Sequence, residues 1–300
     1  MRVTDSTLAD QLSGDLESQQ ATITNLDEEL SSGNALEQPS DNPVEVADTM
    51  SYKRQIAQAA STQTNATYAQ SWLGIGNQTA NQVINTLQSV NTTVLQALSS
   101  GSNSTESYSA LAQQVQGDIS QLVSLANTQY GSTAIFAGTA AVSQPYSSSG
   151  AYSGNSQAFT VQVGSGSPIA VSVPGDQLFG GGTSGIQSVF TTLQNIVTHL
   201  QQGPGSASLA SLQSDSSALS TNMTQAEAAA TTLGESTEQV TAATTASTNT
   251  STQLQKILSS TESADVPTVT AALQSDLTTY QAALYAVSQT VPETLAQFLK

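Results

Sequence analysis

The sequence predicts a mainly α-helical fold: a long antiparallel helical bundle or coiled coil formed by both chain termini, with a small β-rich domain inserted at its distal end. Near the N-terminus, apolar residues recur in alternating steps of four and three, the spacing of a helical seam, at Leu12, Leu16, Ile23, Leu26 and Leu30. In the middle of the chain, residues 159–163 and 169–173 alternate with period two instead. Because helices occupy both ends and strands the middle, the chain must double back and bring its two ends together.

The first helix is predicted over residues 1 to about 38, with its end near Gly33, because glycine readily takes the left-handed conformation that closes helices. A rigid turn follows between Pro39 and Pro43, since each proline disfavours the helical conformation of the residue before it. Pro43 suits the first position of a second helix, which we expect to start near Val44.

The remaining elements before the C-terminal half follow from the same signals. Within the second helix, Gly74 and Gly76 predict a kink or break. A third helix is predicted over residues 111–126. The two period-two segments are joined by residues 164–168 (Gly-Ser-Gly-Ser-Pro), which predicts a β-hairpin. A further helix is predicted over residues 189–200.

The C-terminal half predicts two more helices. A long helix over about 205–260 keeps the heptad register at Leu212, Leu219, Met223, Ala226, Ala230, Leu233, Val240, Leu254 and Leu258. Ser and Thr fill the other seam positions, and these bury far less than the leucines at roughly 25 cal/mol per Å² of apolar surface, so such helices are marginal alone. The last helix begins at Pro267, and Pro292 is expected to bend or stop it.

Composition excludes several classes of protein. Only 9% of the 300 residues are charged, and 22 acidic residues against 5 basic ones give a formal net charge of −17. Nucleic acid is therefore not an expected partner, because binding phosphates requires clustered Lys and Arg. The absence of Cys excludes disulfides and thiolate metal sites. No apolar stretch is long enough to cross a membrane, and acidic residues among the first twenty positions argue against a cleaved signal peptide.

No residue is predicted to be catalytic, to bind a cofactor or to bind a metal. His199 is the only histidine, so we expect it to lie in solvent at a helix end. An ordered pocket that joined His199 to a buried Asp or Glu would instead favour an enzyme. Residues 180–185 fit G-x-G-x-x-G formally, but the acidic residue that a dinucleotide site needs about twenty positions later is missing, so a flexible turn is the better interpretation.

Two short motifs carry a resemblance to a known family. Residues 30–33 (Leu-Ser-Ser-Gly) and 39–43 (Pro-Ser-Asp-Asn-Pro) resemble the N-terminal signature of the flagellin superfamily, in the form carried by its hook–filament junction members. Asn42 departs slightly from the pattern, since Asp is commoner there. Residues 125–127 (Leu-Ala-Asn) and 135–139 (Ile-Phe-Ala-Gly-Thr) follow in the family's order.

The resemblance implies a layered organisation that the spacing alone does not establish. Residues 1–40 and 262–300 would pair as an inner terminal coiled coil, and residues 41–130 with 205–261 would form a second helical layer. Residues 131–204 would form a β-rich outer insert with a short helix. The inner-layer assembly residues are then Leu12, Leu16, Ile23, Leu26, Leu30, Leu273, Leu277, Tyr280 and Leu284, and the turn that sets the angle between layers is Pro39, Ser40, Asp41, Asn42 and Pro43.

The resemblance also implies a structural role outside the bacterial cell, without catalysis. The chain would join the flagellar hook to the filament, as a layer on which flagellin assembles. Expected partners are copies of the chain in a ring, the hook-side junction protein, flagellin, an export chaperone and the type III export apparatus, but neither nucleic acid nor a membrane. The alternative is a divergent flagellin that forms the filament itself.

Overall fold

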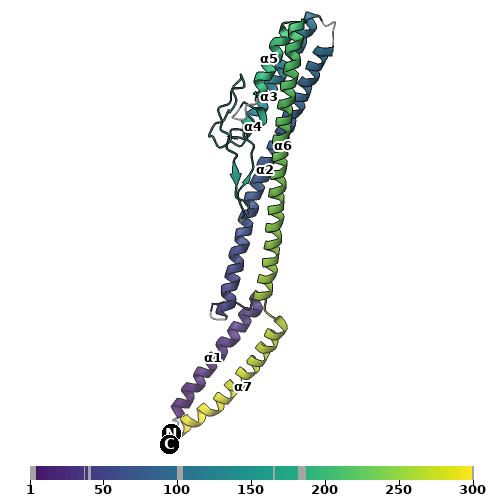
Figure 1. Ribbon diagram of the computed structural model, residues 1–300. Coiled ribbons are helices and arrows are strands. Elements are labelled where there is room, and N and C mark those ends of the chain that lie inside the picture. Colours follow the sequence, from purple (N-terminus) through teal and green to yellow (C-terminus); the bar gives the residue numbers. More distant parts are fainter. Residues whose placement is uncertain are drawn as a thin grey trace. The chain divides into compact units, whose positions relative to one another are not determined.

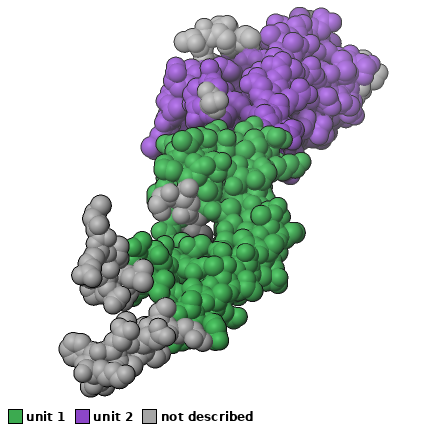
Figure 2. All heavy atoms as spheres, turned by 90° about the horizontal axis from the view of Figure 1, so that it is seen from below, with its two compact units in different colours: residues 1–58, 250–300 green, residues 59–249 purple. Residues whose placement is uncertain are grey.

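The computed structural model describes residues 5–36, 38, 39, 42–99, 104–164, 166–181 and 187–298. The chain divides into two compact units: unit 1 contains residues 1–58 and 250–300, and unit 2 contains residues 59–249 (Figure 2). Helices dominate both units, which confirms the mainly α-helical fold class. Among the described residues, no helix has the length and apolar character that spanning a bilayer requires.

In unit 1 the two terminal helices run side by side in opposite directions. These are α1 (Asp5–Ser32) and α7 (Val266–Phe298), drawn in purple and yellow in Figure 1. The hydroxyl of Tyr280 on α7 donates a hydrogen bond to Oε1 of Gln20 on α1, 3.4 Å away. The two helices therefore form an antiparallel pair.

The ends of these helices differ from the sequence prediction. α1 ends at Ser32 rather than near residue 38, because Gly33 takes a left-handed conformation with φ of 73° and closes the helix. The predicted stop at Pro292 is wrong, since α7 continues to Phe298. A proline inside a helix removes one hydrogen bond and crowds the preceding turn, so the alternative, a bend at Pro292, stays a prediction.

In unit 2, α2 (Pro43–Ser99) and α6 (Ser206–Glu262) are the two longest helices, and each also extends into unit 1. The predicted break at Gly74 and Gly76 is wrong, because α2 is one uninterrupted helix; the alternative, a kink at these glycines, stays a prediction. A methyl group added at Gly76 would lie 3.5 Å from a methyl of Leu233 on α6, an ordinary van der Waals contact. This part of α2 therefore packs against α6.

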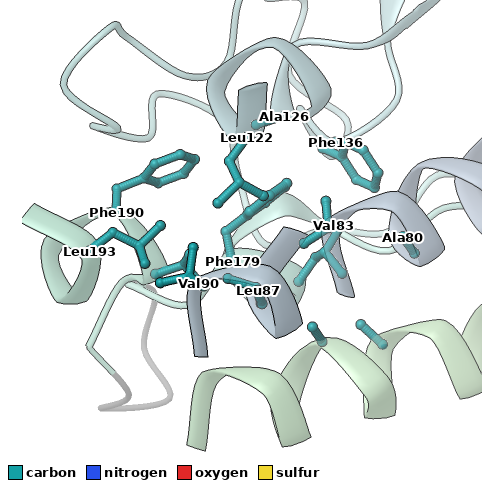
Figure 3. Close-up of a cluster of buried hydrophobic side chains, with 14 of the residues drawn as sticks. Ala80, Val83, Leu87, Val90, Leu122, Ala126, Phe136, Phe179, Phe190 and Leu193 are labelled. Carbon is teal, nitrogen blue, oxygen red and sulfur yellow. The ribbon is translucent and has the colours of Figure 1, made fainter. Parts of the chain in front are cut away.

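Two shorter helices, α3 (Thr105–Ala126) and α5 (Val189–Gln201), pack together and complete the core of unit 2. Figure 3 shows the centre of this core, where side chains of α2, α3 and α5 point toward one another and toward Phe136 of the connecting segment. Phe179 of the short helix α4 (Gly175–Phe179) meets Phe136 edge to face, with ring centroids 5.7 Å apart. Such aromatic contacts add to simple area burial.

The β structure is small. Strand β1 (Gln129–Tyr130) pairs antiparallel with β2 (Thr133–Ala134), and β3 (Thr160–Val161) pairs antiparallel with β4 (Ile169–Ala170). The predicted hairpin is confirmed, but each of its strands has two residues instead of five. Next to the two paired residues of β3, the N–H of Phe159 donates to the hydroxyl of Ser172, although its carbonyl still accepts a hydrogen bond from the N–H of Val171 at 2.8 Å.

The hairpin lies against the side of α2, within unit 2. Nδ2 of Asn65 donates to the carbonyl oxygen of Gln162, 3.0 Å away, and the rings of Trp72 and Phe159 have centroids 5.2 Å apart. The position of the insert thus differs from the one expected at the distal end of the bundle. The aromatic contacts explain the difference, since Tyr68 and Trp72 supply a surface on α2 that the strands cover.

The core makes a direct prediction about stability. Leu87→Ala should destabilise unit 2 by about 2–5 kcal/mol, because Leu87 is fully buried and the change leaves a cavity. Leu95→Ala on the same helix is the matched control, since Leu95 is 51% exposed and its loss should change stability by about 0.5 kcal/mol or less. Urea unfolding followed by circular dichroism measures both; equal losses would contradict the packing described here.

Candidate assembly site

The predicted N-terminal seam residues share one face of α1. Leu12, Leu16, Ile23, Leu26 and Leu30 are all partly buried, together with Gln19, while most other residues from 11 to 28 are exposed. Because α1 contacts α7, this half-buried face is the one that meets the other terminal helix. A face only partly covered by one neighbour still has apolar area available for another.

The predicted residues of α7 fall on two different faces. Leu273 and Tyr280 are partly buried, whereas Leu277 is 39% exposed and Leu284 is 44% exposed. The more buried positions of α7 are Val269, Thr270, Ala272, Leu273, Asp276, Tyr280, Ala283 and Val287, and most of them lie close to one face. At about 100° per residue, Leu277 and Leu284 point roughly 60–80° away from the centre of that face.

Val266 lies on the same line of α7 as Leu277 and Leu284 and is 48% exposed. We call these three residues the α7 stripe. The structure therefore brings Leu273 and Tyr280 to α1 and leaves the α7 stripe exposed along one flank. The heptad spacing did not distinguish the two sets, because a 3.5-residue period drifts around a helix of 3.6 residues per turn.

A short clasp joins the end of α1 to the connection between α6 and α7. The N–H of Ala35 donates to the carbonyl of Glu262 at 2.7 Å, and the N–H of Ala264 donates to the carbonyl of Gly33 at 2.9 Å. These bonds flank an antiparallel bridge between Asn34 and Ser263. The clasp was not predicted from the sequence, because its two halves stand at opposite ends of the chain; the one local signal was Gly33.

A side chain of α2 also holds the clasp, through an ion pair. Nζ of Lys53 on α2 lies 2.6 Å from Oε1 of Glu262, whose side chain is 19% exposed against 59% for Lys53. Exposed pairs contribute little on their own, typically up to about 1 kcal/mol. Here the carboxylate belongs to the residue whose carbonyl accepts the bond from Ala35, so the pair fixes the position of the clasp.

The predicted interlayer turn is described only in part. Ser40 and Asp41 lie outside the described residues, and Pro39 is exposed. Oδ1 of Asn42 accepts a hydrogen bond from the N–H of Glu45 at 3.3 Å, so Asn42 caps α2, and Pro43 is the first residue of that helix. Asn42 departs from the family pattern, in which Asp is commoner at this position, but Asn caps a helix as well as Asp does.

His199 does not lie free in solvent, so that expectation is wrong. Its Nδ1 lies 2.6 Å from Oδ2 of Asp215, and the side chains of His199 and Asp215 are 25% and 10% exposed. The pair links the last turn of α5 to α6. The hydroxyl of Ser208 donates to the main-chain carbonyl of His199 and not to its ring. The arrangement is therefore a structural link between two helices rather than a nucleophile aligned with its base.

Other candidate chemistry is limited. Within the described part of the chain, no group of three or more His, Asp or Glu side chains could hold a metal ion. Residues 182–185 of the glycine-rich motif lie outside the described residues. A polar groove of about 500 Å³ lies between α2 and α3, lined by Gln82, Asn85, Thr86, Ser89, Asp118 and Gln121. Burial raises the pKa of the Asp118 carboxyl above its usual range.

Comparison with known proteins finds similarity to flagellar proteins. Residues 3–141 match the family described as the bacterial flagellin N-terminal helical region. This match contains both N-terminal motifs, the whole of α1 and α2, and α3. This part of the chain is therefore similar to that region of the bacterial flagellins.

Two curated relatives of this chain are each named flagellar hook-associated protein 3. The protein from Salmonella typhimurium is 27% identical over 186 residues, covering 61% of this chain and 58% of the relative. The protein from Escherichia coli is 28% identical over 159 residues, covering 52% of this chain and 50% of the relative. The chain thus spans about half the length of the curated relatives it matches. The resemblance to the hook-associated branch of the flagellin superfamily is confirmed.

Solved structures have a fold similar to that of this chain. A structure described as a flagellar hook-associated protein from Vibrio parahaemolyticus has a TM-score of 0.67 at 19% identity, covering 74% of this chain and 100% of the other. At such low identity the likeness concerns the fold alone. It confirms a mainly helical architecture with a small β region.

The clasp predicts opposite effects for two glycine substitutions. Gly33→Ala should destabilise unit 1 by about 1–2 kcal/mol, because a Cβ disfavours the left-handed conformation at φ of 73°. Gly14→Ala is the control within α1, where nothing lies within 4 Å, and it should stabilise the helix by about 0.5–1 kcal/mol. Hydrogen exchange of the α1 amides should become faster in the first variant and slower in the second.

The buried carboxyl of Asp118 predicts a pH-dependent stability difference. Since the folded pKa is raised, ionising Asp118 costs stability as pH rises through the folded pKa, and this cost is absent below the unfolded pKa. Asp118→Asn should therefore melt at a higher temperature than the wild type at pH 7, and the difference should vanish near pH 3. Glu238→Gln, at an exposed position of α6, is the control. Calorimetry at both pH values tests this, and a lower melting temperature for Asp118→Asn at pH 7 would oppose it.

Proposed function

We propose that this chain is a structural subunit of the bacterial flagellum that joins hook to filament, forming a junction layer on which flagellin assembles. The observation that carries the proposal is the exposed α7 stripe beside the half-buried pairing of α1 with α7. Both curated relatives bear the name of a hook-associated protein, which supports the same role.

The distribution of exposed apolar side chains supports assembly through unit 1. Six of the eight large hydrophobic side chains exposed among the described residues belong to unit 1, although unit 2 has more residues: Val44, Met50, Val266, Leu277, Leu284 and Tyr285. Covering such a surface with neighbouring subunits contributes about 1.5–3 kcal/mol for each large side chain fully buried. Contact with neighbouring subunits would therefore explain why these apolar side chains are exposed in the single chain.

The assembly we propose repeats one head-to-tail contact around an axis, because heterologous contacts generate rings or helical filaments. Residues 1–40 with 262–300 would form its inner layer, residues 41–130 with 205–261 the next layer, and residues 131–204 the outer insert. Leu12, Leu16, Ile23, Leu26, Leu30, Leu273 and Tyr280 would pair the terminal helices, while Leu277 and Leu284 would face a neighbouring subunit. The turn from Pro39 to Pro43 would set the angle between layers.

The partners that follow are copies of the chain in a ring, the hook-side junction protein on one face and flagellin on the other. We further propose export through the flagellar type III apparatus with a chaperone, to an extracellular site. We propose no catalytic activity, because the His199–Asp215 pair links α5 to α6 and the Ser208 hydroxyl bonds to a main-chain carbonyl.

A divergent flagellin is the second candidate, because the match of residues 3–141 to the flagellin N-terminal region fits this role as well. The two roles differ in self-assembly. A filament subunit polymerises on its own seeds, whereas a junction subunit stays monomeric after purification and adds only to a preformed hook. Sedimentation after seeding with hooks or with filament fragments separates the two.

The α7 stripe provides the mutational test. Leu277→Gln combined with Leu284→Gln should weaken incorporation onto hooks at least tenfold, because the loss of two apolar contacts exceeds the roughly 1.4 kcal/mol that a factor of ten requires. Helix content should not change, since both side chains are exposed in the single chain.

Leu95→Gln is the matched control, since Leu95 is 51% exposed on α2 within unit 2. Cells that carry only the double variant should release flagellin into the medium and stay non-motile. Normal junctions and motility in such cells would refute an assembly role for the α7 stripe.

A further inference from the structure

An acidic side chain is buried at the start of α4 without a compensating charge. Asp176 is 5% exposed, and its Oδ2 accepts a hydrogen bond of 2.6 Å from the hydroxyl of Ser156. Its other carboxylate oxygen, Oδ1, is buried and has no hydrogen-bond partner. Among the described residues, the ion pairs join Lys53 to Glu262 and His199 to Asp215, and Asp176 takes part in neither.

Two more buried oxygen atoms without partners lie at the same segment of α4. The hydroxyl of Tyr146 is one; a methyl group added at Gly175 would lie 2.5 Å from it. Oε1 of Gln225 on α6 is the other, and Nε2 of the same amide donates to the carbonyls of Asp176 at 3.2 Å and Gln177 at 2.9 Å. Three buried oxygen atoms without partners thus belong to residues that lie in, or contact, the segment 175–177.

The three oxygens are of the type that a hard cation prefers: one carboxylate, one amide carbonyl and one hydroxyl. Burial, with smaller contributions from Tyr152 and Asp176, raises the pKa of Tyr146 far above its usual range, so the hydroxyl remains neutral. An isolated buried carboxylate is costly unless it is paired or coordinates a metal ion. With a net charge of −17, the chain also offers few cations of its own.

We propose that the Asp176 site binds a single hard cation, with Ca²⁺ as its probe, through Oδ1 of Asp176, Oε1 of Gln225 and the hydroxyl of Tyr146. The site has one carboxylate, so the affinity should resemble that of weak extracellular calcium modules, with Kd of about 10⁻⁴–10⁻³ M. The cation would tie the connecting segment and α4 to α6. This proposal does not depend on the assembly role, because it concerns the isolated chain.

The test uses the full chain, freed of metal with a chelator, and titrates CaCl₂ by calorimetry and by thermal melting. The wild type should bind one Ca²⁺ at this site and melt at a higher temperature in millimolar Ca²⁺, since a ligand that binds only the folded state stabilises it. Asp176→Asn should lose at least tenfold in affinity and most of the shift in melting temperature. Asp118→Asn is the control for a partly buried carboxylate elsewhere in unit 2, and it should bind as the wild type does.

Tyr146→Phe keeps the ring among its aromatic neighbours and removes only the hydroxyl. If Asp176→Asn does not fold, Tyr146→Phe therefore tests Ca²⁺ binding at the Asp176 site in its place. It should weaken Ca²⁺ binding several-fold while its near-ultraviolet circular dichroism in chelator remains native. The proposal is overturned if the wild type shows no Ca²⁺-dependent shift. It is equally overturned if Asp176→Asn, or Tyr146→Phe in its place, binds Ca²⁺ as tightly as the wild type, because surface carboxylates would then account for the binding.

Discussion

The packing of α6 against α2 through positions seven residues apart is the constraint on which unit 2 depends. Leu212, Leu219, Ala226, Leu233 and Val240 recur at this interval on α6, and each is at most 1% exposed. The positions between them carry polar residues such as Asn222 and Ser236, so apolar area alone holds the pair weakly.

Polar contacts compensate by specifying which residues of the two helices meet. Nδ2 of Asn77 donates to the hydroxyl of Thr237 at 3.1 Å, and the hydroxyl of Ser247 donates to the carbonyl of Ala59 at 3.2 Å. A buried polar contact of this kind fixes the register of a helix pair, since a shift by one turn would leave its groups unsatisfied. In unit 1 the clasp at Glu262 serves the same purpose for α1 and α7 through main-chain bonds.

Helical periodicity predicted most of this fold because helices depend on local sequence. It identified the face of α1, the heptad of α6 and the hairpin. It could not show contacts between residues distant in sequence, such as the contact between Gly76 and Leu233. For the same reason it did not pair His199 with Asp215, nor gather Tyr146, Asp176 and Gln225 at one segment. Leu277 and Leu284 were grouped with Leu273 and Tyr280 because spacing gives a stripe but not its exact centre.

The hydrogen bond between Ser247 and Ala59 also bears on the order in which parts of the chain fold. Bringing Ala35 to Glu262 in an open chain requires closing a very long loop, at an entropic cost that grows with the logarithm of its length. Once unit 2 has folded and joined Ala59 to Ser247, only two short stretches remain to be ordered, which lowers that cost by roughly 1.5 kcal/mol. The terminal helices should accordingly dock last during folding and detach first during unfolding, so that a chain with released tails and an intact middle is the natural partly folded species.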